Sequence, residues 1–274
     1  ILEKIENEEL DLKFKLFKKH FNLNLSESIN YNLITLILYQ YLKKLDSFEL
    51  LKKLNNTGYL LFNSPFINIE GINVTSDKIN SLFDYEKINN FKNLKNVKNI
   101  LEIGAGLGRT SQAILDLEKI NNYTICDIPP ALFLSYQRLK TAFPNKKVNL
   151  LYNISDNENL IKSIYSSDIS FIMPHQLEII KKYKFDMTIA VDCLHEMDKK
   201  TISLYLNQIN RISKFFYFSV WKNTTVPFSG VSNKLGNRLD YFKNDYPLPS
   251  NWEKTFEEDL VFPSNYICAG FKII

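Results

Sequence analysis

The chain has 274 residues, of which 45% are hydrophobic and 14% aromatic, and this composition excludes a disordered chain. Its 34 basic and 30 acidic residues give a net charge of +4 and are scattered along the chain, so nothing indicates a nucleic-acid partner. The most apolar stretch, residues 29–42, is interrupted by Asn, Thr and Gln and is shorter than the roughly 20 residues of a membrane-spanning helix. We therefore expect a soluble protein with one large core and a smaller appendage.

Three cysteines, Cys126, Cys193 and Cys268, lie far apart, and no two of them form a Cys-x-x-Cys pair. This spacing favours buried thiols in a reducing compartment over disulfides or a zinc site, and it predicts a cytoplasmic location. The first residues, "ILEKIENEELDLKF", are charged and periodic, which is not typical of a signal peptide. The chain does not begin with methionine, so residue 1 need not be the native start.

Residues 1–75 are predicted to form a helical N-terminal region. Apolar residues recur at three- and four-residue steps in residues 9–21 and 29–45. A third helix is predicted in residues 45–60, where Asn-Asn-Thr-Gly marks its end. This region is expected to act as a cap over the remaining domain, residues 76–274, and to pair two subunits in a homodimer.

A further helix is predicted in residues 71–91, with Ser76 or Asp77 as its N-cap. From residue 98 onward, short apolar runs alternate with helical stretches, and residues 254–274 could supply a closing antiparallel pair. This alternation predicts right-handed crossovers and an α/β fold with a doubly wound, mostly parallel sheet. The predicted strands are residues 98–103, 123–128, 169–174, 185–197 and 214–221, and the predicted helices are residues 109–120, 130–143 and 201–213.

Three of the eight glycines, Gly104, Gly106 and Gly108, fall within five positions of "ILEIGAGLGR", between a predicted strand and a predicted helix. Glycine there permits positive φ and a close backbone approach to a ligand, although a tight turn without a ligand would use the same residues. The dinucleotide fingerprint requires a glycine where this chain has Arg109, which disfavours a nicotinamide oxidoreductase. Glu102, two residues before the first glycine, suits a ligand that carries an ammonium group.

An acidic residue, Asp127, ends the second predicted strand, 23 residues after the first glycine of the turn. In this position a carboxylate can accept hydrogen bonds from both hydroxyls of a ribose. Asp127 could also cap a helix that begins at Pro129 or Pro130, and the two roles are compatible. After the third predicted strand, His175 and Gln176 could form a polar turn.

The glycine segment, with its acid at position 102, resembles motif I of the class I S-adenosylmethionine-dependent methyltransferases. More widely, residues 70–260 resemble the bacterial sugar O-methyltransferase family, through "GINVTSDKINSLFDYEKI", "CDIPPALFLSYQRL", "FIMPHQLEII", "FDMTIAVDCLHEM" and "DYPLPSNWE". The resemblance implies a Rossmann-like methyltransferase domain with S-adenosylmethionine as cofactor and S-adenosylhomocysteine as product. In such enzymes the loop after the third strand borders the adenine, so His175 and Gln176 could reach its polar edge instead of forming only a polar turn. The cofactor site that the resemblance implies consists of Glu102, Gly104, Ala105, Gly106, Gly108, Arg109, Asp127, Ile128, Pro129, His175, Gln176 and Asp192.

The fourth predicted strand delivers "VDCLHEM" to the sheet edge where the reactive groups of doubly wound folds gather. A hydroxyl acceptor needs a base, and His195, oriented by Asp192 or Glu196, has a suitable titration range. The segment resembles "His-Asp-Trp-Ser-Asp-Glu" of plant small-molecule O-methyltransferases, in which the His is the base. In the sugar O-methyltransferases Gln often stands at the position of His195, before the same Glu-Met, which favours Glu196. His195, Glu196 and Asp192 are therefore alternative bases, beside a purely positioning role for His195.

Two other chemistries are weighed at this segment. The nucleophilic Cys of RNA cytosine-5 methyltransferases directly follows a Pro, whereas Asp192 precedes Cys193 here, so Cys193 is interpreted as pocket wall. Asp192, His195 and Glu196 could in principle hold Mg²⁺. No second carboxylate cluster is evident in the sequence, so no metal site is predicted.

The long insertion after the fifth predicted strand is expected to bind the acceptor, because long loops in compact domains are usually functional or disordered. The sequence therefore predicts an S-adenosylmethionine-dependent O-methyltransferase that acts on a sugar hydroxyl, in a surface polysaccharide or its nucleotide-linked precursor. The alternatives are an O-methyltransferase for a phenol or another small natural product, and a non-catalytic S-adenosylmethionine-binding partner subunit. The candidate acceptor residues, which would stack on a sugar ring or bond its hydroxyls or a nucleotide phosphate, are Trp221, Asn223, Arg238, Asp240, Tyr241 and Trp252.

Overall fold

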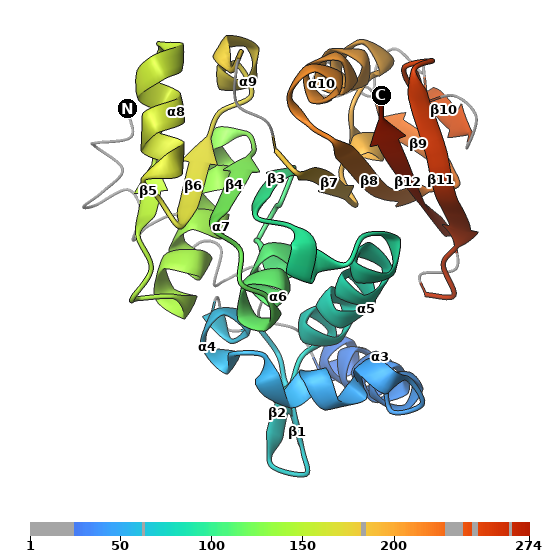
Figure 1. Cartoon of the computed structure of the whole chain (residues 1–274). Helices are drawn as coiled ribbons and strands as arrows, with labels where there is room; N and C mark the ends of the chain where they lie inside the picture. Colours follow the sequence, from blue (N-terminus) through green and yellow to red (C-terminus); the bar gives the residue numbers. More distant parts are fainter. Residues whose placement is uncertain (1–24, 62–63, 182–184, 228–237, 243–245, 263–264) are drawn as a thin grey trace. The chain divides into compact units, whose positions relative to one another are not determined.

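The chain divides into two compact units, residues 1–83 and 84–274, and the division falls inside helix α5 (Ser76–Phe91). This division lies later in the chain than residue 75, where the sequence predicts the end of the N-terminal region. The predicted helix over residues 9–21 lies outside the described residues. The computed structural model describes residues 25–61, 64–181, 185–227, 238–242, 246–262 and 265–274 (Figure 1).

The described part of the first unit is mainly helical, but it also contains an antiparallel hairpin that departs from the helical prediction. Its turn holds Glu70 and Gly71 at positive φ. The N-cap of α5 is Thr75, one residue before the predicted Ser76, because the Thr75 hydroxyl accepts the Lys78 N–H at 3.0 Å. No described helix is long and apolar enough to cross a lipid bilayer. The helices of this unit before α5 are α3 (Leu25–Leu42), η2 (Asp46–Lys53) and α4 (Asn56–Tyr59), and the hairpin consists of β1 (Ile67–Ile69) and β2 (Ile72–Val74).

An eight-stranded sheet organises the second unit. In chain order its strands are β3 (Asn99–Ile103), β4 (Asn122–Cys126), β5 (Val148–Leu150), β6 (Ile169–Ile172), β7 (Met187–Val191), β8 (Phe215–Trp221), β11 (Trp252–Asp259) and β12 (Tyr266–Ile273). In space the order is β11-β12-β8-β7-β3-β4-β6-β5, with every pair from β8 to β5 parallel. β12 runs antiparallel to β8, and β11 antiparallel to β12. The predicted doubly wound, mostly parallel sheet and its closing antiparallel pair are confirmed.

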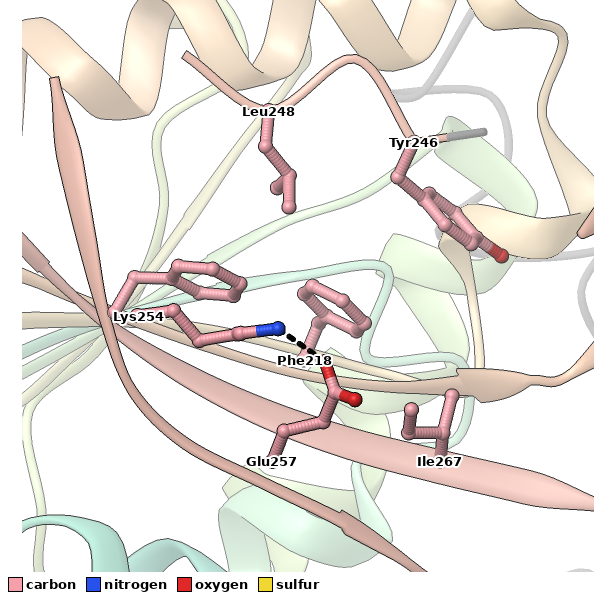
Figure 2. A pocket seen from close by; sticks show the side chains of 7 residues that line it. Phe218, Tyr246, Leu248, Lys254, Glu257 and Ile267 are labelled. Carbon is pink, nitrogen blue, oxygen red and sulfur yellow. Dashed lines mark hydrogen bonds and ion pairs between the residues drawn. The ribbon is translucent and has the colours of Figure 1, made fainter. Parts of the chain in front are cut away.

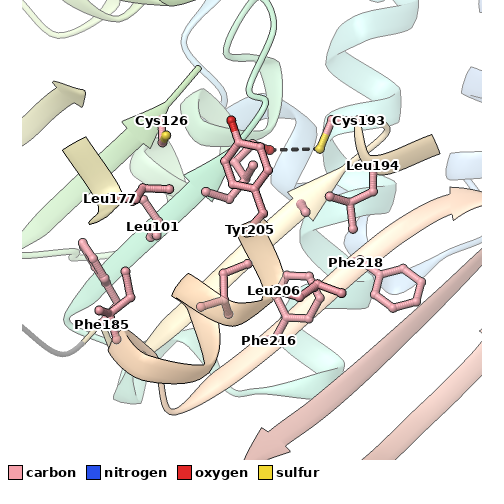
Figure 3. Close-up of a cluster of buried hydrophobic side chains, with 14 of the residues drawn as sticks. Leu101, Cys126, Leu177, Phe185, Cys193, Leu194, Tyr205, Leu206, Phe216 and Phe218 are labelled. Carbon is pink, nitrogen blue, oxygen red and sulfur yellow. Dashed lines mark hydrogen bonds between the residues drawn. The ribbon is translucent and has the colours of Figure 1, made fainter. Parts of the chain in front are cut away.

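Helices cover both faces of this sheet (Figure 1). One face carries α5, α6 (Arg109–Leu117) and α7 (Pro129–Ala142), and there Phe91 packs beside Tyr217 and Tyr136 packs on the edge of Phe171. The other face carries α8 (Asn157–Tyr165), α9 (Gln176–Ile179) and α10 (Lys199–Ile212), whose apolar side chains join one buried cluster with the strands. Figure 3 shows Leu206 of α10 in this cluster, beside Phe216.

Two parts of the second unit were not predicted. The edge strand β5 and helix α8 occupy a stretch that the sequence leaves unassigned. The predicted insertion contains an antiparallel hairpin of β9 (Asn223–Pro227) and β10 (Arg238–Phe242), in a two-stranded sheet of its own. Neither part contains the short, continuous apolar runs by which the central strands were identified.

The winding of the sheet reverses between β3 and β7. From β3 the chain passes to β4, then to the edge strand β5 and back to β6, which lies between β4 and β5. It then crosses to β7 on the other side of β3 and continues to β8. In doubly wound folds, ligands bind beyond the carboxyl ends of the strands at such a reversal. The residues that follow β3 and β7, Gly104 and Asp192, both lie at this edge.

Candidate active site

The glycine-rich turn joins β3 to α6. Gly104, Gly106 and Gly108 have φ values of 67°, 56° and 74°, a left-handed conformation in which a side chain is disfavoured. A Cβ on Gly104 would lie 2.5 Å from the Cβ of Cys193, whereas a Cβ on Gly106 would meet no protein atom within 4 Å. Packing therefore requires glycine at position 104, and Gly106 borders open space that a ligand could fill.

The carboxylate of Asp127, directly after β4, ties the turn to the neighbouring strand. Its Oδ2 accepts the Gly106 N–H at 2.9 Å, and its Oδ1 accepts the Ile128 N–H at 2.7 Å. Burial raises the pKa of Asp127, and these two backbone bonds oppose that shift. The N-cap of α7 is Ile128, so Asp127 does not cap this helix. Each carboxylate oxygen can accept a second hydrogen bond, so Asp127 keeps capacity for ligand hydroxyls.

Glu102 of β3 lies next to the turn and is only 2% exposed. Its Oε2 accepts a hydrogen bond from the Tyr123 hydroxyl at 2.8 Å. Burial raises the pKa of Glu102 to about 7, against the opposing effects of the Tyr123 bond and the charge of Arg109. The carboxyl group therefore takes up a proton close to neutral pH, and a cation beside it would favour the ionised form.

Arg109, the first residue of α6, forms an ion pair with Asp84 of α5. The Thr110 hydroxyl donates to the same Asp84 oxygen at 3.3 Å. Burial raises the pKa of Asp84, and the neighbouring guanidinium lowers it. These contacts join α5 to α6 beside the glycine turn. The predicted contact of Arg109 with a cofactor stays a prediction.

Asp192 directly follows β7 and has φ 58°, which is uncommon for a residue with a Cβ. Its Oδ1 accepts a hydrogen bond from the Tyr266 hydroxyl and lies 3.4 Å from Nε2 of His195. The side chain is 44% exposed, so Asp192 presents its carboxylate to solvent while two partners hold it. Uncommon backbone conformations of this kind cluster at functional sites.

His195 lies in the short 3-10 helix η5 (Leu194–Glu196), and its side chain is only 3% exposed. Its Nδ1 accepts a long hydrogen bond of 3.5 Å from the Trp221 N–H, and its ring stacks on the Trp221 indole at 4.7 Å between centroids. Burial lowers the pKa of His195, and the charge of Asp192 opposes this. Both ring nitrogens face protein groups, so His195 is better placed to position Asp192 than to take a proton from a ligand.

Glu196, the next residue, is exposed. Burial of part of its side chain raises the pKa of Glu196, and so do the negative charges of Asp192 and Asp127. The three carboxylates therefore share one electrostatic neighbourhood at the carboxyl edge of the sheet. A raised pKa makes a carboxylate a better proton acceptor near neutral pH.

The cysteines pack as the sequence predicts. All three are buried and free of disulfides. The Cys193 thiol donates to the Ile103 carbonyl at 3.1 Å, and burial raises the pKa of Cys193 well above its usual range, which suits pocket wall and not a nucleophile. Among the described residues, no three His, Cys, Asp or Glu side chains are grouped to hold a metal ion.

Gln176 fits the second of the two roles that the sequence allowed, a polar turn. It has no exposed surface, and its amide nitrogen donates to the Leu151 and Ile154 carbonyls at 2.7 Å each, while its Oε1 accepts the Met173 N–H at 2.8 Å. These bonds hold two loops together and leave no face for an adenine. His175 beside it is exposed, and its contact with a cofactor stays a prediction.

The candidate acceptor residues fall into three groups. Trp221, at the end of β8, is 37% exposed, with one ring face on His195. Trp252 is a core residue: its indole N–H donates to Asn210 at 2.7 Å and its ring packs on Phe216, so the predicted sugar contact is wrong. The structure describes the strands, but not the side chains, of Asn223, Arg238, Asp240 and Tyr241.

Tyr266, the first residue of β12, is part of the site although the sequence did not point to it. It pairs with Trp221 across the sheet and donates its hydroxyl to Asp192, 74 residues away in the chain. Burial raises the pKa of Tyr266, as does its bond to Asp192, so the phenol stays protonated and donates. Only the pairing of β12 with β8 brings it here, and no local motif signals that pairing.

A cavity of about 180 Å³ lies elsewhere, on the α10 face of the sheet. Phe218, Phe271 and Tyr246 line it. Lys254 and Glu257 also line it, and they form an ion pair with 2.8 Å between Nζ and Oε2 (Figure 2). None of the predicted site residues whose side chains the structure describes lines this cavity.

No protein-family model matches the chain, and no curated protein matches its sequence. Similar solved structures include an S-adenosylmethionine-dependent methyltransferase from Clostridium acetobutylicum (12% identity, 70% of this chain, 90% of that chain, TM-score 0.43). Others are M. capricolum TrmK with S-adenosylhomocysteine (14% identity, 68% and 67%, TM-score 0.40) and a mutant of MtNAS with S-adenosylmethionine (11%, 98% and 80%, TM-score 0.46). Similarities this low say nothing about the substrate, and the fold assignment rests on the strand order alone.

Proposed function

We propose that the chain is an S-adenosylmethionine-dependent O-methyltransferase that acts on a sugar hydroxyl. The observation that carries most weight is the bond between the Asp127 carboxylate and the Gly106 N–H. It joins the carboxyl ends of β3 and β4 around a glycine whose missing Cβ leaves open space. The resemblance of residues 70–260 to the sugar O-methyltransferase family supports the choice of acceptor.

The residues of this edge fit the cofactor. Glu102 would face its ammonium group, the backbone of residues 104–108 would lie along it, and Asp127 would accept hydrogen bonds from its ribose hydroxyls. The exposed Ile128, which directly follows Asp127, offers apolar surface to its base. A pyrophosphate would meet carboxylates here, which disfavours a dinucleotide. When bound, S-adenosylmethionine supplies an electrophilic methyl group on a sulfonium.

The chain's own part in the reaction is to orient the acceptor and to remove its proton. The exposed indole of Trp221 would stack on the apolar face of a sugar ring. Glu196 would take the hydroxyl proton, because its pKa is raised and its side chain is exposed. His195, buried between Asp192 and Trp221, would hold these neighbours in place. The carboxylates of Glu196 and Asp192, which lie in different environments, would thus take different roles.

Thermal unfolding with S-adenosylhomocysteine, in parallel with NAD, tests the cofactor. A ligand at about 100 times its dissociation constant adds about 2.7 kcal/mol to stability. For a domain of this size that corresponds to roughly 5–10 °C in Tm. We expect this shift with S-adenosylhomocysteine and none with NAD; a shift with NAD alone would overturn the proposed function.

The affinity for S-adenosylhomocysteine is expected to depend on pH through Glu102. The folded-state pKa of Glu102 is about 7 and the ligand ammonium favours the ionised carboxylate, so affinity falls as pH drops below 7. Between pH 7 and pH 5 we expect a loss of up to about tenfold per unit, measured by titration calorimetry. Glu102→Gln should bind more weakly at pH 7.5 and lose this slope; an unchanged slope would contradict the assignment.

A further inference from the structure

The Asp192 carboxylate is fixed from two sides by residues that the chain brings from separate elements. Tyr266 donates its hydroxyl from the start of β12, and Nε2 of His195 lies 3.4 Å away on η5. The rings of Tyr266 and Trp221 meet edge to face at 6.1 Å, and Trp221 stacks on His195. The carboxylate therefore has a defined position without being buried.

The segment that carries Asp192 lies directly against the glycine turn. The Cβ of Cys193 is so near Gly104 that a Cβ there would lie 2.5 Å from it, and the Cys193 thiol donates to the carbonyl of Ile103. Asp192 is thus one residue from the contact that joins the ends of β3 and β7. A ligand along the turn at Gly104 would therefore lie near the segment that carries Asp192.

Several carboxylates of the described residues gather at this edge. Asp127 and Asp192 both raise the pKa of Glu196, and the three carboxylates therefore lie within electrostatic range of one another. Arg109, whose positive charge acts on Glu102 and Tyr266, forms an ion pair with Asp84. Carboxylates gathered in this way raise the local concentration of a cationic ligand.

We propose that Asp192, held by Tyr266 and His195, is the counter-charge for the sulfonium of S-adenosylmethionine and makes the chain prefer this cation to its neutral product. The inference rests on the proposed function and deepens it. The two ligands differ only in the methyl group and the positive charge on sulfur. A fixed carboxylate beside that sulfur therefore favours binding of the substrate form and release of the product form.

The test compares two dissociation constants, for S-adenosylmethionine and for S-adenosylhomocysteine, by titration calorimetry at pH 7.5 and low salt. Asp192→Asn removes the charge, and asparagine tolerates the left-handed conformation of this position. We expect the ratio of the two dissociation constants to shift about tenfold against S-adenosylmethionine in this variant, which is the size expected of one partly exposed charge pair. Its affinity for S-adenosylhomocysteine should be nearly unchanged. Added salt should reduce the wild-type preference.

Glu196→Gln is the matched control, because it removes one exposed carboxylate four residues away. It should reduce the preference by less than half as much as Asp192→Asn. Equal effects of the two substitutions, or an equal loss of affinity for both ligands in Asp192→Asn, would overturn the role of Asp192. Failure of the wild-type chain to bind either ligand would instead overturn the proposed function.

Tyr266→Phe tests the positioning role separately, because it keeps the ring and removes only the hydroxyl. It should lower the preference for S-adenosylmethionine about threefold, a fraction of the effect of losing the charge itself. In the Asp192→Asn background the same substitution should change the preference no further, since residues that act as one unit are not additive. An additive effect would show that Tyr266 does not act through Asp192. Circular dichroism melting of each variant confirms that it is folded.

Discussion

Replacing Gly104 with alanine is expected to destabilise the second unit by about 2–5 kcal/mol. The left-handed conformation at φ 67° costs a residue with a Cβ about 1–2 kcal/mol. The new Cβ would also lie 2.5 Å from the Cβ of Cys193, and overpacking of this kind costs about 1–3 kcal/mol. In thermal denaturation the midpoint should fall by roughly 10 °C.

Gly106→Ala is the matched control for this effect. Its φ of 56° carries a similar conformational cost, but no protein atom lies within 4 Å of the added Cβ. Its Tm should fall less, while its affinity for S-adenosylhomocysteine should fall by at least about tenfold because the methyl group fills the space of the ligand. Adding Cys193→Gly to Gly104→Ala should restore part of the lost stability. Equal melting of the two alanine variants would contradict the contact with Cys193.

The central sheet could be predicted because its strands differ in pattern from the helices between them. Strands such as β3, β4 and β7 are buried on both faces and appear in the sequence as short apolar runs. The edge strand β5 has three half-buried residues, Val148–Leu150, and leaves no such run. The hairpin β1–β2 is equally short, and its turn at Glu70 and Gly71 has no strong hairpin signal in the sequence.

The site was predictable where its residues are close in sequence to a strand end. The glycine turn directly follows β3 and Asp127 directly follows β4. The hydrogen bond between Gly106 and Asp127 therefore joins two residues that the sequence analysis had already singled out. Whether a polar or aromatic side chain turns inward is a tertiary property. Gln176 and Trp252 turn inward, to backbone carbonyls and to Asn210, and Tyr266 reaches the site from the far end of the chain. Sequence alone could not separate these three cases.

The choice among the three candidate bases shows the same limit, because their order in "VDCLHEM" does not reveal their exposure. In the structure His195 is buried against Trp221, Asp192 is held by Tyr266, and Glu196 is exposed with a raised pKa. In the proposed function, these environments, and not the residue types, would distinguish the positioning group from the proton acceptor.

Glu196→Gln is therefore expected to lower kcat by about 10²–10⁴-fold, the usual contribution of a general base. Its dissociation constant for S-adenosylhomocysteine should change little, because the cofactor would lie on Asp127 and the glycine turn. The pKa of Glu196 is raised, so wild-type activity should fall on the acid side at a pH above the usual carboxylate range, and this limb should be absent in the variant. The measurement is methyl transfer from labelled S-adenosylmethionine to a panel of sugar acceptors, against pH.

His195→Gln separates the two remaining assignments. Glutamine keeps a polar side chain beside Asp192, whose Oδ1 lies 3.4 Å from Nε2 of His195, and it is the residue that often stands here in the family that the sequence resembles. If His195 only positions its neighbours, this variant should lose at most about tenfold in kcat and keep the acid limb, since the base is still present. If His195 takes the proton, His195→Gln should lose as much activity as Glu196→Gln, and the limb should disappear with the imidazole. That result would return the base to His195 and leave Glu196 as a carboxylate of the cofactor site.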